Sequence, residues 1–182
     1  MMRFLFAKIP MSNFPDETEK ISLRPALPSD ELLLFRLYAS TRLEEFLMVP
    51  WNEAQLEAFL KMQFDAQRRT YRMQYPAADH HIILKGAQET GRLMVHRTVD
   101  DILLVDITLL PEFRGRGIGG KLLGELQSEA AREGQRVRLH VLRTNPARRL
   151  YERSGFSTIG GDSMYEEMLW QPSNARRGVH DE

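Results

Sequence analysis

The chain has 182 residues and a mass of 21.1 kDa, a length that fits one globular domain with a single core. Its 25 Lys and Arg residues balance 25 Asp and Glu residues, so a formal net charge of zero argues against general binding to nucleic acids or membrane surfaces. The absence of cysteine excludes disulfides, a thiolate nucleophile and a cysteine-based metal site. No apolar run in the sequence approaches the length of a membrane-spanning helix.

Both ends of the sequence are expected to lie outside the folded domain. Residues 1–20 begin with an apolar stretch that Lys8 interrupts, and no clear signal-peptide cleavage site follows. Residues 171–182 are mostly polar, as is typical of a frayed tail. We therefore expect a flexible leader over 1–20, one domain over 21–170 and a flexible tail over 171–182, in a cytoplasmic protein.

The N-terminal half predicts the order β-α-α-β-β. Ser29 and Asn52 are suitable caps for the two helices, because their side-chain oxygens can accept a backbone hydrogen bond. Pro76 should end the second helix. The expected bounds are 21–24 for the first strand, 29–42 and 52–75 for the helices, and 81–84 and 92–95 for the next strands, with Gly86 and Gly91 flanking the turn between them.

The C-terminal half predicts three further pairs of elements, β-α, β-α and β-β. The apolar run 102–110 predicts a long central strand, and residues 118–133 have helical periodicity that Gly134 closes. The remaining elements are a strand at 137–142, a short helix at 146–154, and a hairpin of strands 157–159 and 165–170.

Residues 114–120, Arg-Gly-Arg-Gly-Ile-Gly-Gly, carry the strongest functional signal in the chain. Four glycines between 115 and 120 follow the central strand and open a helix, so several backbone amides can point into one space. Such a turn binds phosphate or pyrophosphate. A P-loop is excluded because no Gly-Lys-Ser/Thr run is present, and the dinucleotide fingerprint is matched only loosely and in mid-chain.

A third pattern, Arg-x-x-Gly-x-Gly, is made by Arg114, Gly117 and Gly119. This segment resembles the acetyl-CoA loop of the GCN5-related N-acetyltransferases, the GNAT superfamily. Residues 139–156 are similar to that family's late strand, its Asn, its short helix with a Leu-Tyr pair and its closing Gly-Phe. The resemblance implies an α/β protein with the GNAT (acyl-CoA N-acyltransferase) fold, a mixed six- or seven-stranded sheet flanked by helices.

The resemblance also implies an activity. The chain would transfer an acetyl group from acetyl-CoA, as acyl-donor co-substrate and without a metal, to a primary amine by direct attack in a ternary complex. The acceptor would be an amine-bearing small molecule or peptide, with no nucleic acid or membrane as partner, and homodimer formation is left open. The alternatives are a non-catalytic acyl-CoA-binding sensor or interaction module, and an NAD(P)-binding α/β domain.

In the resembling family, the central strand and the next parallel strand splay apart, and the donor enters that gap. Asn145 would hydrogen-bond the pantetheine or phosphate arm, or simply begin the helix. Arg148 and Arg149 could help with the nucleotide phosphates, solvated surface arginines being the alternative. The residues that the resemblance assigns to the donor are Ile107, Thr108, Leu109, Arg114, Gly115, Arg116, Gly117, Ile118, Gly119, Gly120 and Asn145.

Tyr151 and His140 are the candidate catalytic residues. Tyr151 lies where the family places its acid, and a phenol can protonate a departing thiolate; the alternative is a tyrosine packed beside Phe156. His140 is the candidate base, because histidine titrates in the useful range, and an ordinary strand histidine is the alternative. Asp106 and Asp101 are further candidates, and Asp106 must find a partner or solvent in its apolar strand.

Two other groups of side chains are candidates for an acceptor pocket and for a metal site. Tyr71, Met73 and Tyr75 could line an acceptor pocket, although such a stripe is more often part of a core. The pair His80-His81 lacks a third ligand at any familiar spacing, so no metal site is predicted.

Overall fold

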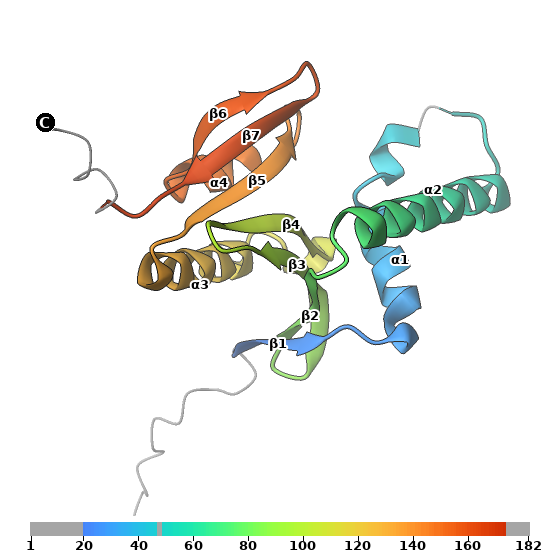
Figure 1. Cartoon of the computed structure of the whole chain (residues 1–182). Coiled ribbons are helices and arrows are strands. Elements are labelled where there is room, and N and C mark those ends of the chain that lie inside the picture. Colours follow the sequence, from blue (N-terminus) through green and yellow to red (C-terminus); the bar gives the residue numbers. More distant parts are fainter. Residues whose placement is uncertain (1–19, 47–48, 174–182) are drawn as a thin grey trace, which may run out of the picture.

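The computed structural model describes residues 20–46 and 49–173. These residues form a seven-stranded mixed sheet in the order β1-β2-β3-β4-β5-β7-β6 (Figure 1). Its strands are β1 (Ile21–Pro25), β2 (Asp79–Lys85), β3 (Gln88–Arg97), β4 (Asp101–Leu109), β5 (Arg136–Leu142), β6 (Ser157–Gly161) and β7 (Tyr165–Trp170). The α-helices are α1 (Glu31–Ser40), α2 (Glu53–Gln74), α3 (Ile118–Glu133) and α4 (Arg148–Arg153), and the 3-10 turns are η2 (Pro28–Asp30), η3 (Leu43–Phe46) and η4 (Pro111–Phe113).

The predicted order of strands and α-helices is confirmed, and α3 has the predicted bounds. Most of the predicted leader and tail, residues 1–19 and 174–182, lies outside the described residues. In the two described ranges, none of the helices combines the length and apolarity needed to cross a bilayer.

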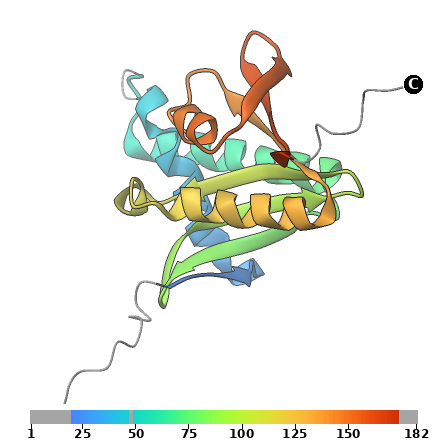
Figure 2. The same cartoon turned by 90° about the vertical axis from the view of Figure 1, so that its left-hand side faces the viewer.

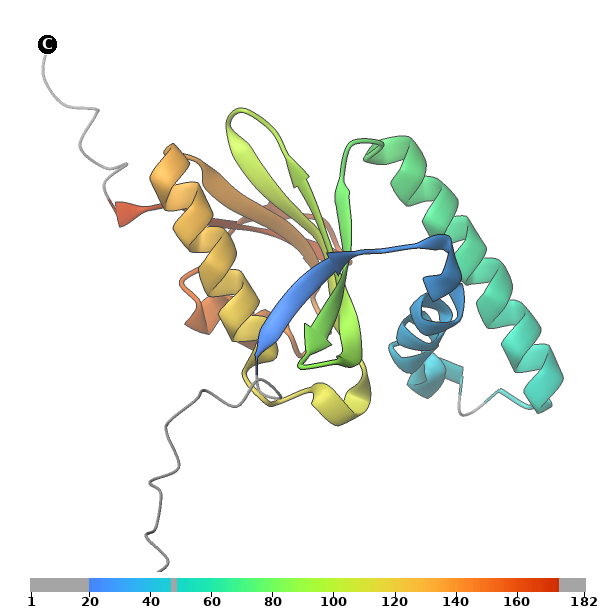
Figure 3. The ribbon, with the colours of Figure 1, turned by 90° about the horizontal axis from the view of Figure 1, so that it is seen from below.

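Helices cover both faces of the sheet, so two apolar cores form. On one face, α1 and α2 pack onto the sheet around Leu37, Phe64 and Ile82 (Figure 3). On the other face, α3 and α4 pack around a second core that includes Leu123 and Tyr151. Figure 2 shows α3 in front of the sheet, with α1 and α2 behind it. Functional residues of the central strands can therefore face either of two helical layers.

The two predicted helix caps have different outcomes. Asn52 is confirmed, since its side chain accepts a hydrogen bond of 2.9 Å from the amide of Gln55 at the start of α2. The prediction for Ser29 is wrong, because the chain first makes the 3-10 turn η2 and α1 begins at Glu31. Asp30 stabilises this turn, and its carboxylate accepts hydrogen bonds from the amide of Leu27 (2.7 Å) and from Arg24 (2.8 Å).

Gly91 does not lie in the turn between β2 and β3, as predicted, but inside β3. A Cβ atom at Gly91 would collide with the carbonyl oxygen of Thr108 in β4, so this position requires glycine for close strand approach. The turn itself contains Gly86, whose φ of 57° lies in the left-handed region. The short helix predicted from residue 146 begins at Arg148 instead.

Candidate active site

The parallel strands β4 and β5 separate part-way along their length. Their pairing ends at Leu104 and Leu139, although both strands continue. On its other side β4 carries a bulge, because Val105 has no partner where the β3–β4 register shifts. A bulge bends a strand, and Figure 1 shows β5 and β7 turning away from β4. On the side that faces β5, β4 therefore has no strand partner after Leu104, and an extended ligand can pair with this edge. At its end, the Leu109 carbonyl already accepts a hydrogen bond from Arg114.

The glycine-rich loop lies beyond this edge, at the N-terminus of α3. Gly115 and Gly117 have φ of 71° and 78°, which side chains rarely adopt. Within the described ranges, the amides of residues 117–120 donate no hydrogen bond to another residue. A Cβ at Gly115 or Gly117 would have no heavy atom within 4 Å, so there is open space beside the loop. Free amides and the helix dipole together make a site for a phosphate anion.

The two arginines of the loop have different surroundings. Arg114 turns toward the protein, where its Nε donates to the Leu109 carbonyl (2.9 Å) and its Nη2 donates to the Ser40 hydroxyl (2.9 Å). This side chain therefore ties the loop to the ends of β4 and α1. Arg116 is exposed, and its guanidinium lies 5.7 Å from the centre of the Phe113 ring.

Tyr151 projects from α4 into the core, where the residue is only 7% exposed. Its ring meets that of Phe156 edge-on, with centroids 6.0 Å apart. Burial raises the pKa of Tyr151 to about 12, and the negative charge of Asp106 on β4 adds to this effect. Within the described part of the chain the Tyr151 hydroxyl makes no hydrogen bond, so it is available to a ligand.

His140 is exposed on β5, in the part of the strand that no longer pairs with β4. Its neighbours in the strand, Leu139 and Val141, are buried in the core beneath α3. Because side chains alternate along a strand, His140 points to the opposite face, toward the α2 side. The structure thus places His140 and Tyr151 on different faces of the sheet, with His140 on the unpaired part of β5 and Tyr151 in the core beneath α3 and α4.

Residues 76–158 match the family model described as an acetyltransferase (GNAT) domain. The chain contains a GNAT acetyltransferase domain. The matched residues include β4, the glycine-rich loop, β5 and α4, which are the elements that build this site. Over 78 residues the chain is 33% identical to the [ribosomal protein bS18]-alanine N-acetyltransferase of Haemophilus influenzae, a match of 42% of this chain and 53% of that enzyme. The chain therefore spans about half the length of this curated relative.

Solved structures confirm the GNAT fold. The PaiA N-acetyltransferase of Thermoplasma acidophilum, in complex with coenzyme A, has a TM-score of 0.63 at 17% identity, over 84% of this chain and 99% of that one. The ribosomal-protein-S18-alanine N-acetyltransferase of Escherichia coli has a TM-score of 0.56 at 18% identity, over 89% of this chain and 100% of that one. The expected mixed sheet with helices on both faces is thereby confirmed.

The entry to α4 is fixed by contacts within the GNAT domain. The Asn145 side chain accepts a hydrogen bond of 2.9 Å from the Ala147 amide, which is the helix-entry arrangement. Arg148 lies between two carboxylates, with Nε 2.8 Å from Glu166 and Nη2 3.3 Å from Glu152. Its charge is therefore already paired, whereas Arg149 next to it is exposed.

A buried polar cluster on the α2 face of the GNAT sheet was not predicted. Arg92 of β3 is 4% exposed, pairs closely with Asp106 and donates a 3.1 Å hydrogen bond to Gln67 of α2. Asp106 also accepts hydrogen bonds from Thr108 (2.7 Å) and Tyr71 (3.5 Å). Asp106 thus has the polar partner that a carboxylate in a mostly apolar strand needs. Because side chains alternate along a strand, the sequence of β3 can predict that Arg92 lies on this face of the sheet. It cannot predict that Asp106 of the neighbouring strand is its partner.

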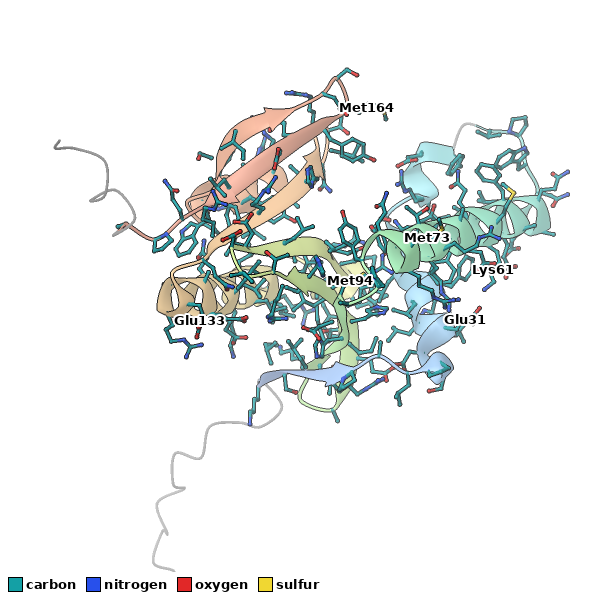
Figure 4. The ribbon with its side chains drawn as sticks, in the orientation of Figure 1. Glu31, Lys61, Met73, Met94, Glu133 and Met164 are labelled. Carbon is teal, nitrogen blue, oxygen red and sulfur yellow. The ribbon has the colours of Figure 1, made fainter. Side chains whose placement is uncertain are left out.

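The three residues considered for an acceptor pocket do not share one environment. Tyr71 points to Asp106, and burial, followed by this carboxylate, raises the pKa of its phenol. Tyr75 packs against His96 with ring centroids 5.8 Å apart. Met73 is 83% exposed on the outer side of α2 (Figure 4). Only Tyr71 therefore borders the polar cluster next to the gap.

The adjacent histidines point to opposite faces of β2. His80 lies on the α2 face with its Nε2 buried and unpaired, whereas His81 borders a shallow hollow beneath α3. Across residues 20–46 and 49–173, there is no group of three or more His, Asp or Glu residues arranged to hold a metal ion.

Proposed function

We propose that this GNAT domain is an acetyl-CoA-dependent N-acetyltransferase that acts on a primary amine by direct attack in a ternary complex. The observation that carries the proposal is the separation of β4 and β5 after Leu104 and Leu139, next to the free amides of residues 117–120. An extended donor with a pyrophosphate group fits both features at once. Acetyl-CoA supplies the reactive acetyl thioester.

In the proposed donor site, the backbone of Ile107, Thr108 and Leu109 binds the pantetheine arm as an added strand would. The amides of the glycine-rich loop bind the pyrophosphate, with the exposed Arg116 adding positive charge. Arg114 acts mainly by holding the loop in place, since its guanidinium already bonds Ser40 and Leu109. Asn145, an exposed residue before α4, is proposed to hydrogen-bond the pantetheine or phosphate arm.

Tyr151 is the proposed acid. As the amine nitrogen bonds to the acetyl carbon and the carbon–sulfur bond breaks, the Tyr151 hydroxyl gives its proton to the departing sulfur. A pKa of about 12 keeps this phenol protonated at neutral pH. The attacking amine must lose a proton, and His140 is the proposed base. Asp106 is the alternative, although its two oxygens already accept hydrogen bonds from Arg92, Thr108 and Tyr71.

The relatives suggest the kind of acceptor. Two of them are named as alanine N-acetyltransferases of ribosomal protein S18. We therefore propose the N-terminal amine of a peptide as the first acceptor to test, ahead of small amines. A ribosomal acceptor would also place the activity in the cytoplasm.

The first experiment is the thermal-unfolding midpoint with acetyl-CoA, and separately with NADH and with ATP. A ligand that binds only the native state at about 100 times its dissociation constant should stabilise the protein by about 2.7 kcal/mol. A rise with acetyl-CoA alone supports the donor site. No rise at saturating acetyl-CoA contradicts it, and a rise with NADH alone supports the NAD(P)-binding alternative.

The second experiment measures thiol release from acetyl-CoA with a peptide that begins with alanine. The protein contributes no thiol of its own, because it has no cysteine. The same peptide with a blocked N-terminus is the control, and a panel of small primary amines follows. A Tyr151→Phe variant should bind acetyl-CoA normally and keep only a small residual turnover. Donor binding without turnover of any acceptor would favour the non-catalytic binding module.

A further inference from the structure

Glu166 of β7 is a charged residue buried at the base of α4. It is 4% exposed, and it lies opposite Val141 of β5 in the antiparallel ladder. One carboxylate oxygen is 2.7 Å from Arg143 Nη1, and the other is 2.8 Å from Arg148 Nε. The Thr158 hydroxyl also donates a hydrogen bond of 3.3 Å to it. The carboxylate therefore has partners in three segments of the chain.

These partners bracket the turn that leads from β5 into α4. Arg143 lies one residue beyond β5, and its Nε also donates to the Asp162 carbonyl (3.0 Å). Arg148 is the first residue of α4. Through these two ion pairs, Glu166 connects both ends of the turn over residues 143–148 to β7. Asn145 lies within this turn, and Tyr151 follows it by less than two helical turns.

The position of Tyr151 depends on such contacts because α4 has only six residues. A helix this short has little stability of its own, so tertiary contacts must fix where it lies. At its C-terminal end, Gln127 of α3 donates a hydrogen bond of 2.6 Å to the Ser154 carbonyl. At its N-terminal end, the ion pair between Arg148 and Glu166 is the corresponding contact.

The geometry points to Glu166 as a positioning residue that sets the place of the Tyr151 hydroxyl in the gap between β4 and β5. The inference rests on the proposed role of Tyr151 as acid. Among the described residues the Glu166 carboxylate contacts Arg143, Arg148 and Thr158, so we infer that it acts on Tyr151 through the two arginines and α4. A misplacement of about 1 Å at a reacting group can cost roughly 100-fold in rate.

The first test monitors the surroundings of Tyr151 by ¹⁹F NMR and does not require the protein to turn over a substrate. The protein is labelled with 3-fluorotyrosine, and its five tyrosines give separate ¹⁹F signals, of which the Tyr151 signal is the one missing from Tyr151→Phe. Glu166→Gln keeps the shape of the side chain and removes its charge. We expect the Tyr151 signal to shift or broaden in this variant, both alone and with coenzyme A bound. Glu152→Gln, which removes only the exposed partner of Arg148, should leave the signal in place.

The second test is a double-mutant cycle on turnover with the best acceptor found above. Glu166→Gln should lower kcat by about ten-fold, within the range expected for a displaced catalytic group, and leave the acetyl-CoA dissociation constant within two-fold. In a Tyr151→Phe background the same change should have no further effect on kcat. Additive losses would mean that Glu166 does not act through Tyr151.

An unchanged Tyr151 signal in Glu166→Gln would overturn the inference. If Glu166→Gln does not fold, Arg148→Gln breaks the same contact from its exposed side, and its result is read in the same way. If the wild type turns over no acceptor, the proposed function fails, while the ¹⁹F signals still decide whether Glu166 positions Tyr151.

Discussion

Arg92 of β3 and Asp106 of β4 form an ion pair that is buried beneath α2, with side chains 5% and 11% exposed. The pair lies directly after the bulge at Val105, where β4 begins to leave β5. Gln67 and Tyr71 of α2 bond to its two members. The ion pair therefore joins α2 to the sheet at the point where the proposed donor gap opens.

Breaking this pair from one side should be costly. Arg92→Leu leaves the Asp106 carboxylate buried without its counter-charge, and we expect a loss of roughly 3–5 kcal/mol in the free energy of unfolding, measured with urea. Replacing both residues by leucine should recover much of that loss. Arg42→Leu, which breaks an exposed pair with Glu45, should cost no more than about 1 kcal/mol. Equal losses of unfolding free energy in Arg92→Leu and Arg42→Leu would show that the buried pair contributes no more to stability than the exposed pair.

The sequence predicts the elements of this fold well, because apolar periodicity and caps are local signals. The bounds of α3 follow from its periodicity and from Gly134, whose φ of 69° ends the helix in the left-handed region. Gly91 was misplaced because its role depends on the Thr108 carbonyl in a neighbouring strand. The prediction of Ser29 as a cap is wrong because Asp30 is held by Arg24, a residue of β1.

The same limit applies to the candidate site. The loop glycines and Tyr151 belong to contiguous motifs, so a resemblance could identify them. Arg92 and Glu166 gain their importance from partners 14 and 23 residues away, which no local pattern reveals. The separation of β4 and β5 likewise depends on which strands pair, and for how long, in the folded sheet.

Gly117→Ala tests the donor loop. The alanine must adopt a φ of 78° at the N-cap of α3, at a cost of about 1–2 kcal/mol, or the loop must change shape and turn its amides away. We expect the affinity for coenzyme A, measured by calorimetry, to fall about ten-fold, which is 1.4 kcal/mol.

Gly124→Ala is the matched control within the same helix. A Cβ there meets no heavy atom within 4 Å, so this change should raise stability by about 0.5–1 kcal/mol and leave coenzyme A affinity unchanged. Wild-type affinity in the Gly117 variant would remove the loop from the donor site.

His80 should make the protein less stable in mild acid. Burial, followed by the charge of Arg92, lowers the pKa of His80 below 6.5, so the folded state resists taking up a proton. The unfolded chain then binds more protons below pH 6.5. The free energy of unfolding is therefore not reduced by His80 above pH 6.5, and it declines as pH falls from 6.5 toward the lower pKa of the folded state.

The measurement is the urea-unfolding free energy between pH 8 and pH 4.5 for the wild type, His80→Gln and His81→Gln. Replacing His80 should flatten the decline below pH 6.5. The His81 variant keeps His80 and should keep the wild-type slope. An unchanged slope in His80→Gln would mean that other groups cause the acid sensitivity.

Tyr151 should make stability fall in strong alkali. Burial raises its pKa from 10.0 to about 12, so the folded state holds the phenolic proton more tightly than the unfolded chain does. This contribution, roughly 3 kcal/mol, is complete below pH 10 and is lost as pH rises from 10 to 12. We therefore expect the unfolding free energy of the wild type to fall more steeply than that of Tyr151→Phe over this interval.

The same proton is the one that the proposed acid gives to the leaving sulfur. Tyr151 stays protonated up to about pH 12 in the folded protein. The kcat for acetyl transfer should therefore not fall between pH 8 and pH 10 through loss of this proton. The check is kcat against pH in that interval, with the unfolding curves as a record of intact protein. A loss of kcat with an apparent pKa near 9 in intact wild type would show that a different group serves as the acid.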